Sequence, residues 1–224
     1  MTLRLPRHAL ALALAASLLA AAPALVLAQT PPAPAAAANM QGSPSELVLD
    51  NTKRVLETIE SRRAEFSRDR AALQRFVSGE FETMFDRDYA ARQVLGRHGR
   101  GASDADIKAF GDALADNLMR RYGSSLIDFN TRLRVRIKSE TALPRGLGVK
   151  VSSELLRQGG EPIPVDYLMR RAGNGWRVFD VMVEGVSFVQ TFRQQFDSEL
   201  QRKSIAQVTK DLRSGQISAD AGTR

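Results

Sequence analysis

The sequence contains no cysteine. A chain without cysteine forms no disulfide, so its fold must be stabilised by the packing of an apolar core alone. The same absence excludes thiol catalysis, thiolate metal ligands and sulfur-based redox chemistry.

Residues and motifs for other kinds of catalysis are also scarce. Only two histidines occur, and His98 is the only one after the first 28 residues. It lies in a glycine-flanked turn, where we expect a solvated loop residue rather than a catalytic base. Neither a Gly-x-Ser-x-Gly nucleophile elbow nor a Gly-x-x-x-x-Gly-Lys-[Ser/Thr] phosphate loop is present. We therefore expect neither an enzyme nor a cofactor.

Four aspartates are close together in the sequence, at positions 104, 106, 112 and 116. Asp104 and Asp106 fall where a helix begins, and carboxylates there oppose the positive end of the helix dipole. We interpret Asp112 and Asp116 as part of a polar helix face. This explanation is favoured over a metal site.

Long apolar runs are confined to the N-terminus. Arg4, Arg7 and His8 precede an apolar run over residues 9–22, and Val26-Leu27-Ala28 has small residues where a signal peptidase cuts. This run is too short for a membrane span of about 18 residues or more. We predict a secretory signal peptide over residues 1–28, cleaved after Ala28.

The mature chain is modestly basic. Cleavage removes two basic residues and no acidic one, which leaves 30 basic and 25 acidic residues and a net charge of +5. A solvated surface accounts for this excess, and steering towards an anionic partner or membrane is the alternative. No motif that combines aromatic and basic residues indicates nucleic-acid binding.

Domain organisation follows from composition. Residues 29–42 are rich in proline and alanine and predict a flexible linker. Residues 43–214 are sufficient for one domain with a sizeable core, and residues 215–224 form a tail.

The first half of the domain has helical periodicity. Ser43, Pro44 and Glu46 form a capping box at a helix start. The apolar stripe that follows consists of Leu47, Val48, Val55, Leu56 and Ile59. Further helices are predicted over about 69–78, 80–96 and 103–129, the last capped by Ser103.

The second half alternates with period two. Leu133, Val135 and Ile137 alternate with arginines at 132, 134 and 136, which predicts a strand with one wet and one buried face. Further strands begin at 149, 165 and 176, with tight turns at 158–161 and 173–175. Helical periodicity returns over 186–213, with a break near Ser204. This order predicts an α+β fold: a helical N-terminal half, an antiparallel sheet of about four strands and a C-terminal helix.

The segment from Gly175 to Leu212 contains Trp176, Asp180 and Glu184-Gly185-Val186-Ser187, followed by a helix rich in Gln, Arg and Phe. It resembles the signature of the MlaC, or toluene-tolerance, family. Residues 89–96 and Arg121-Tyr122-Gly123 support the resemblance, which spans about 44–213.

The resemblance implies a cone-like domain, related to nuclear-transport-factor-like folds, with an apolar cavity between sheet and helices. It also implies a periplasmic phospholipid carrier that maintains outer-membrane lipid asymmetry. Its partners would be an outer-membrane lipoprotein–porin complex and an inner-membrane ABC transporter with MCE domains.

Helix stripes and strand alternation give an expected lipid-binding set. It comprises Phe85, Tyr89, Leu118, Tyr122, Val135, Tyr167, Met169, Trp176, Phe179 and Val181. Both faces of the last strand are apolar, so Phe179 and Val181 compete with Val178 and Met182 for the inward face.

The main alternative to lipid binding is catalysis by Asp180. A carboxylate inside an apolar strand could be a general base of a cavity isomerase or cyclase. We favour a structural, hydrogen-bonded or arginine-paired aspartate. Structural roles are likewise favoured for Glu184-Gly185 as a bend, Ser187 as a helix cap and Trp176 as a core residue. A ligand-free envelope scaffold is a third interpretation.

Overall fold

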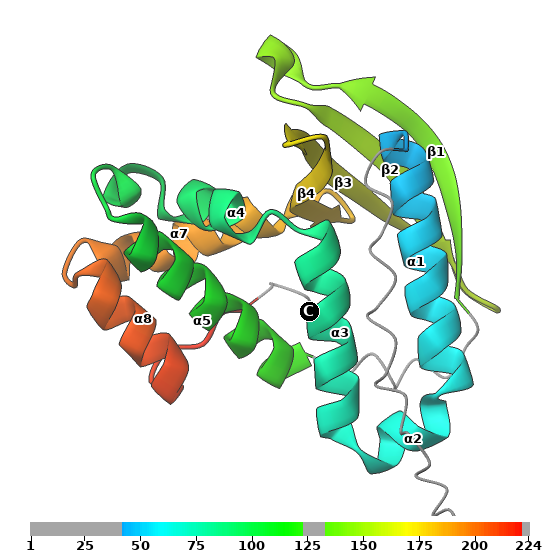
Figure 1. The fold of residues 1–224 in the computed structure, drawn as a ribbon, viewed down its shortest axis with the longest axis horizontal. Coiled ribbons are helices and arrows are strands. Elements are labelled where there is room, and N and C mark those ends of the chain that lie inside the picture. The colour runs from blue at the N-terminus through cyan, green and yellow to red at the C-terminus, as the bar shows by residue number, and fades with distance from the viewer. Residues whose placement is uncertain (1–41, 123–132, 221–224) are drawn as a thin grey trace, which may run out of the picture. The chain divides into compact units, whose positions relative to one another are not determined.

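The computed structural model describes residues 42–122 and 133–220. The predicted signal peptide, almost all of the predicted linker and the end of the tail lie outside the described residues. Figure 1 shows helices on one side of a curved sheet and a second group of helices packed beside it.

The first three helices form a hairpin. Helix α1 (Pro44–Ser61) begins with the predicted capping box, in which Ser43 Oγ accepts from the Glu46 amide at 3.2 Å and Glu46 Oε2 accepts from the Ser43 amide at 3.0 Å. Helix α2 (Arg63–Arg68) turns the chain into α3 (Arg70–Met84). The predicted end near residue 78 was wrong. Helix α3 continues to Met84 because Leu73 and Met84 bury its stripe on both sides of the unfavourable Gly79.

The remaining helices form the second group. They are α4 (Arg87–Leu95), the short 3₁₀ turn η1 (Gly96–Gly99), α5 (Asp104–Tyr122), α7 (Phe188–Leu200) and α8 (Ile205–Ser214). Ser103 caps α5 as predicted, although the expected end near residue 129 lies outside the described residues. Ser204 caps α8 and marks the predicted break. The core of this group includes Phe110 and Phe196, whose rings meet edge to face at 5.7 Å.

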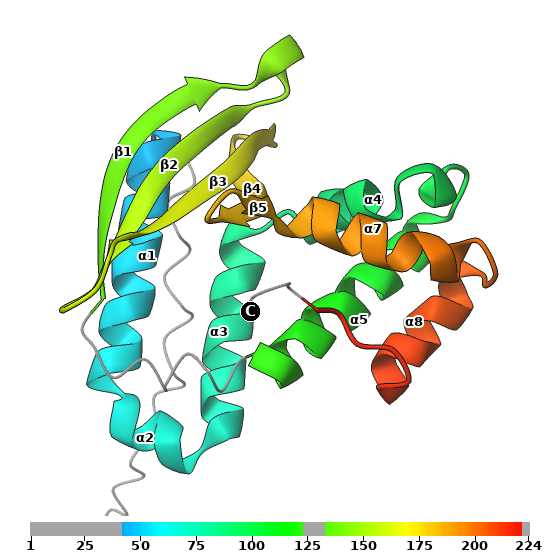
Figure 2. The ribbon, with the colours of Figure 1, turned by 180° about the vertical axis from the view of Figure 1, so that it is seen from behind.

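The sheet is antiparallel, with its strands in sequence order. Its strands are β1 (Arg134–Ala142), β2 (Val149–Leu156), β3 (Ile163–Ala172), β4 (Gly175–Val183) and β5 (Val186–Ser187). The predicted α+β fold is confirmed, with the two-residue β5 added to the expected strands (Figure 2). The predicted tight turn at Gly173 is also confirmed, since Ala172 pairs with Gly175.

One face of the sheet is covered by the first hairpin. Helix α1 packs on β1 and β2, and α3 packs on β4. Along β1, Val135 and Ile137 are half-buried whereas Arg134 and Arg136 are exposed, as the alternation predicts. In the described part of the chain, no helix is long and apolar enough to cross a bilayer.

The α3–α4 connection attaches the sheet to the second group of helices. The Asp86 amide donates to the Val178 carbonyl at 2.7 Å, and the Asp86 carboxylate accepts from the Tyr89 amide at 3.1 Å to cap α4. Arg170 of β3 forms an ion pair with the same carboxylate. Asp86 therefore fixes the end of α3 and the start of α4 against two strands.

Two glycines provide a matched test of backbone constraints. Gly148 has φ 140°, and a Cβ there would lie 1.9 Å from the Met169 carbonyl oxygen, whereas a Cβ at exposed Gly79 meets open space. We expect Gly148→Ala to lower the free energy of unfolding by about 3 kcal/mol or more. Gly79→Ala should raise it by about 0.5–1 kcal/mol. Urea unfolding of both variants measures the difference, and equal effects would contradict this account.

Candidate functional site

An apolar layer lies between α1, α3 and the covered face of the sheet. Its first cluster has a closed core of Val48, Met84, Val151, Met169 and Val178. Larger side chains surround this core and are only half-buried: Leu47, Phe85, Ile137, Val149, Tyr167, Trp176 and Val181.

A second apolar cluster occupies the α2 end of the same helices. Ile59, Phe66, Ala72 and Leu73 are buried there, and Val55, Phe76 and Val77 are half-buried. Phe66 and Phe76 stack at 5.7 Å. This second cluster consists of residues of α1, α2 and α3 alone, so the layer continues between the helices as a separate cluster, and both clusters have large apolar side chains that retain accessible surface. Covering that surface with an apolar ligand is favourable by about 25 cal/mol per Å².

Five of the expected lipid-binding residues come together in the first cluster, namely Phe85, Tyr167, Met169, Trp176 and Val181. Tyr89 and Phe179 instead meet edge to face at 5.2 Å, with the Arg170 guanidinium 4.4 Å above the Tyr89 ring.

The other three expected residues lie elsewhere. Leu118 packs against the core of the second helical group, away from the sheet-covered layer. Val135 is half-buried on β1, opposite Leu155. The side chain of Tyr122 lies outside the described residues.

A register shift decides which residues of β4 face the layer. Leu168 pairs with Asp180 but the next residue, Met169, pairs with Val178, so Phe179 is the extra residue of a bulge. Val178 and Val181 therefore share the layer's face. The sequence left open whether Phe179 and Val181 or Val178 and Met182 face inward, and the bulge places one residue of each pair, Val181 and Val178, on the same face.

Asp180 is a structural residue on the opposite side of β4. It is only 4% exposed, and its carboxylate accepts from Ser187 Oγ at 2.5 Å and from the Val189 amide at 3.0 Å. Ser187 Oγ in turn accepts from the Gln190 amide and caps α7, as predicted. Burial raises the pKa of Asp180, and these hydrogen bonds act against the shift.

The bend before α7 also matches its predicted role. Gly185 has φ 83° and Glu184 has φ 50°, so both residues adopt the left-handed conformation. The Glu184 amide donates to the Pro164 carbonyl at 3.0 Å, which holds the bend against β3.

His98 differs from the expected solvated loop residue. Its side chain is 17% exposed, and Nε2 lies 2.9 Å from Asp197 Oδ1 on α7. Arg97 contacts the same carboxylate at 2.9 Å. The expectation was wrong because α7 returns beside this turn, a contact between residues about a hundred positions apart.

The aspartates of α5 have ordinary partners. Asp104 pairs with Arg92, and Asp106 accepts from Ser103 Oγ at 2.8 Å. Asp112 contacts Arg87 at 2.7 Å and Lys108 at 2.8 Å. Among residues 42–122 and 133–220, no group of three or more His, Cys, Asp or Glu residues could hold a metal ion.

A polar cleft of about 500 Å³, which Phe85 of the first cluster also lines, opens beside the α3–α4 connection. Its charged lining residues are Glu82, Asp86, Arg87, Asp88, Lys108, Asp112 and Arg177. Opposite charges pair within it, as Arg87 does with Asp112, and Arg177 donates to the Glu82 carbonyl at 3.1 Å. This lining does not suit acyl chains, and we assign the apolar layer as the candidate site.

Three polar residues inside the layer are absent from the lipid-binding set that was expected from the sequence. Asn51 and Thr52 of α1 and Glu80 of α3 occupy positions where the apolar stripes continue on both sides. Thr52 lies near the Tyr167 hydroxyl, whose pKa is raised by burial and lowered to a smaller extent by Thr52. The signal was present in the sequence, since the α1 stripe passes from Val48 to Val55 without an apolar residue one turn after Val48.

Comparisons with known families, proteins and solved structures each give a match. A family model described as MlaC protein matches residues 49–214. Toluene tolerance protein Ttg2D of Pseudomonas putida is 23% identical over 163 residues, which cover 71% of this chain and 74% of that protein. A phospholipid-binding protein from Ralstonia solanacearum, solved in complex with a phospholipid, superposes with a TM-score of 0.66 at 22% identity. That match covers 78% of this chain and 98% of the Ralstonia chain.

Replacing Asp180 separates its structural role from a catalytic one. Asp180→Ala leaves the buried Val189 amide without its acceptor, so we expect a loss of about 3 kcal/mol in the free energy of unfolding. Asp180→Asn keeps an acceptor oxygen and should lie within about 1 kcal/mol of the unmodified protein at neutral pH. Urea unfolding gives both values. A general base would make Asp180→Asn inactive in cells while it remained stable.

The pH dependence of this pair follows from the raised pKa of Asp180. Because the folded state holds the proton more tightly than the unfolded state, folding takes up a proton at pH values above the ordinary pKa of 3.8. The stability of the unmodified protein relative to Asp180→Asn should therefore rise as the pH falls into this window and decline as the pH rises. Urea unfolding of both proteins across mildly acidic pH tests the sign, and the reverse trend contradicts it.

Proposed function

Because the chain belongs to the MlaC family, we propose that it is a periplasmic carrier that binds a phospholipid by its acyl chains. The observation that carries this proposal is the shared fold with a phospholipid-bound protein, almost all of whose chain superposes on this one. The half-buried side chains of the apolar layer supply the chemistry that acyl chains require.

We propose the first cluster as the main contact surface for the chains. Within it, Phe85, Tyr167 and Val181 combine large apolar area with partial exposure. The same role is proposed for the rest of the expected set. Leu118 and Tyr122 are its least supported members, since Leu118 packs in the other helical group.

Energetics favour a carrier that exchanges its cargo. Burying about 30 methylenes from water gives more than 20 kcal/mol at about 0.8 kcal/mol each, beyond the practical ceiling of non-covalent affinity. The acyl chains of a lipid taken from a bilayer, however, are shielded from water both before and after transfer. The relevant free energy is the small difference between two apolar environments, so partner complexes can set the direction of transport.

The proposed route joins the two membranes of the envelope. The predicted signal peptide would deliver the chain to the periplasm. There it would exchange lipid with an outer-membrane lipoprotein–porin complex and with an inner-membrane ABC transporter bearing MCE domains, and so maintain outer-membrane lipid asymmetry. This chain has no phosphate loop for ATP, which agrees with a passive carrier.

A binding role is favoured over catalysis by Asp180. Both of its carboxylate oxygens accept hydrogen bonds from the start of α7, and little of its surface is exposed. A general base needs reach to its substrate. The layer that we propose for lipid also lies on the other face of β4.

Native mass spectrometry tests the carrier directly. Protein exported to the periplasm and purified gently should show, beside the mass of the mature chain, an added mass equal to a diacyl phospholipid. Lipid extraction and fragmentation identify the added species. A mass corresponding to the chain alone in such preparations would overturn the proposal.

A matched pair of substitutions tests the location of the site. Val181→Lys places a charge in the layer and should reduce bound lipid by at least about tenfold. Val186→Lys, at an exposed position on β5, should leave lipid binding unchanged. Thermal unfolding controls for loss of the fold, and Val181→Thr offers a milder polar change of similar shape. Equal lipid content in the Val181 and Val186 variants would place the site elsewhere.

A further inference from the structure

A band of polar side chains crosses the apolar layer at one level. On α1, the turn that contains Asn51 and Thr52 separates Val48 of the first cluster from Val55 of the second. On α3, Glu80 similarly separates Val77 of the second cluster from Met84 of the first. Both helices therefore have polar side chains at corresponding levels, and on α3 the half-buried Phe81 continues the apolar stripe beside Glu80 by stacking on Phe85.

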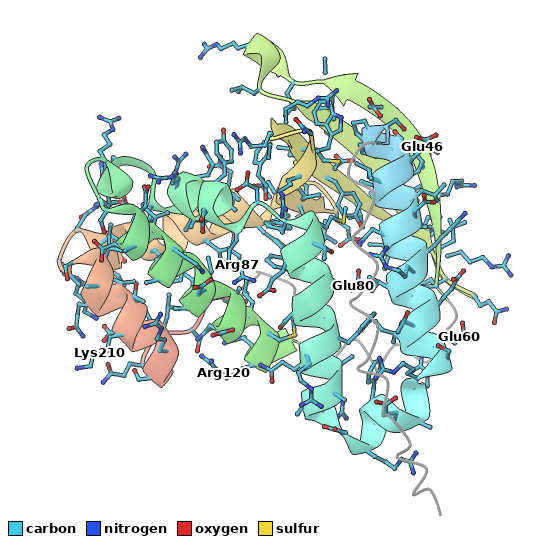
Figure 3. All side chains as sticks on the ribbon, in the orientation of Figure 1. Glu46, Glu60, Glu80, Arg87, Arg120 and Lys210 are labelled. Carbon is cyan, nitrogen blue, oxygen red and sulfur yellow. The ribbon has the colours of Figure 1, made fainter. Side chains whose placement is uncertain are left out.

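The polar side chains of the two helices are joined to each other. Glu80 accepts from Asn51 Nδ2 at 3.2 Å and from Arg54 at 2.5 Å through Nη2 and 3.4 Å through Nε. The Glu80 side chain is 14% exposed and that of Arg54 is 38% exposed. Figure 3 shows Glu80 on α3 at the side where α1 lies.

The sheet completes this arrangement. The Tyr167 hydroxyl of β3 lies near the Thr52 hydroxyl of α1, which lowers the pKa of Tyr167 against the larger, raising effect of burial. We call Asn51, Thr52, Arg54, Glu80 and Tyr167 the polar band. It connects α1, α3 and β3 between the two apolar clusters.

Several N–H and O–H donors of the polar band have no partner within the band. The contacts with Glu80 use two of the five N–H donors of Arg54 and one of the two of Asn51. The Thr52 and Tyr167 hydroxyls have one O–H hydrogen each, so at least one of them is available for a further acceptor even if one hydroxyl donates to the other. The Glu80 carboxylate, by contrast, already accepts three hydrogen bonds. A ligand at this level can therefore be bound through acceptor oxygens.

The charges of Arg54 and Glu80 restrict the kind of ligand further. Arg54 and Glu80 neutralise each other, and an added anion would lie close to the Glu80 carboxylate. A phosphodiester is therefore disfavoured, whereas a neutral carbonyl oxygen meets no such repulsion. Flanking apolar clusters require that this carbonyl be attached to hydrocarbon.

We propose that the polar band binds the acyl ester carbonyls of a diacyl phospholipid, with Asn51, Arg54 and the Thr52–Tyr167 hydroxyl pair as donors. Glu80 is a positioning residue, which holds the Arg54 and Asn51 side chains at the level of the ester groups. This inference rests on the proposed phospholipid binding and assigns the part of the lipid that is recognised by hydrogen bonds.

The alternative is that the polar band only fastens α1 to α3. Such a clasp would stabilise the closed layer whatever lipid it holds, and its loss would weaken the binding of all lipids alike. Ester recognition instead distinguishes an ester-linked lipid from an ether-linked one, because the ether lipid has the same chains and head group but lacks both carbonyl acceptors.

A competition experiment distinguishes ester recognition from a clasp between α1 and α3. The mature protein is incubated with vesicles that contain equal amounts of a diester and a diether phosphatidylcholine of matched chain length, and native mass spectrometry gives the ratio of the bound lipids. Asn51→Leu and Tyr167→Phe each remove one donor, and each should shift this ratio towards the ether lipid by about fivefold or more, the equivalent of one hydrogen bond. Every protein is tested with the same vesicles. A difference between the two lipids in the free energy of leaving the bilayer is therefore the same for all proteins and does not affect the comparison between them.

Lys53→Leu is the matched control for Asn51→Leu, since Lys53 is an exposed neighbour on the same helix. It should keep the ratio of the unmodified protein. Thermal unfolding tests whether each variant remains folded, and Tyr167→Phe preserves the shape of the ring if Asn51→Leu does not fold. An unchanged ratio in both band variants, with less of both lipids bound, overturns ester recognition in favour of the clasp. If the unmodified protein takes up neither lipid, the proposed function fails and this inference fails with it.

Discussion

Asp86 joins the sheet to both groups of helices. Its amide donates to Val178 of β4, and its carboxylate caps α4 and pairs with Arg170 of β3. These contacts fix the C-terminal end of α3 against the sheet, while α1 packs on β1 and β2. The apolar layer depends on this arrangement, because α3 meets the sheet through β4 and its remaining length extends over the layer.

Partial burial of its large apolar side chains is the property that suits the layer to the proposed binding of acyl chains. A core closed by its own side chains offers an apolar ligand nothing further to cover. Here small residues such as Val151 and Val178 are fully buried, whereas Phe85, Tyr167 and Trp176 around them keep exposed surface. That surface lies on rigid elements, so a ligand can be exchanged without rebuilding the fold. The hydrogen bonds proposed for the polar band fix the orientation of a bound lipid, because hydrogen bonds have a preferred geometry and apolar contacts have none.

Local signals in the sequence predicted local structure well. Ser43, Ser103, Ser187 and Ser204 all cap the helices that their positions indicate, because a cap depends on residues three positions apart. Predictions that depended on register were less successful. The bulge at Phe179 cannot be inferred from β4 alone, since it is defined by the pairing of Met169 with Val178. His98 was misjudged for the same reason, because its partner Asp197 is distant in sequence.

The sequence by itself determined the α+β class, the order of elements and the resemblance to the MlaC family, since these follow from periodicity, capping residues and short motifs. It also predicted Ser187 as the cap of the last long helix, whereas the hydrogen bond between Ser187 and Asp180 was established only by the folded structure. Only the tertiary structure decided which expected site residues share a surface, because helix stripes do not specify which element they pack against. Leu118 and Phe85 have similar patterns in sequence, yet they belong to different clusters. The polar band was decided in the same way, by three elements that meet only after folding.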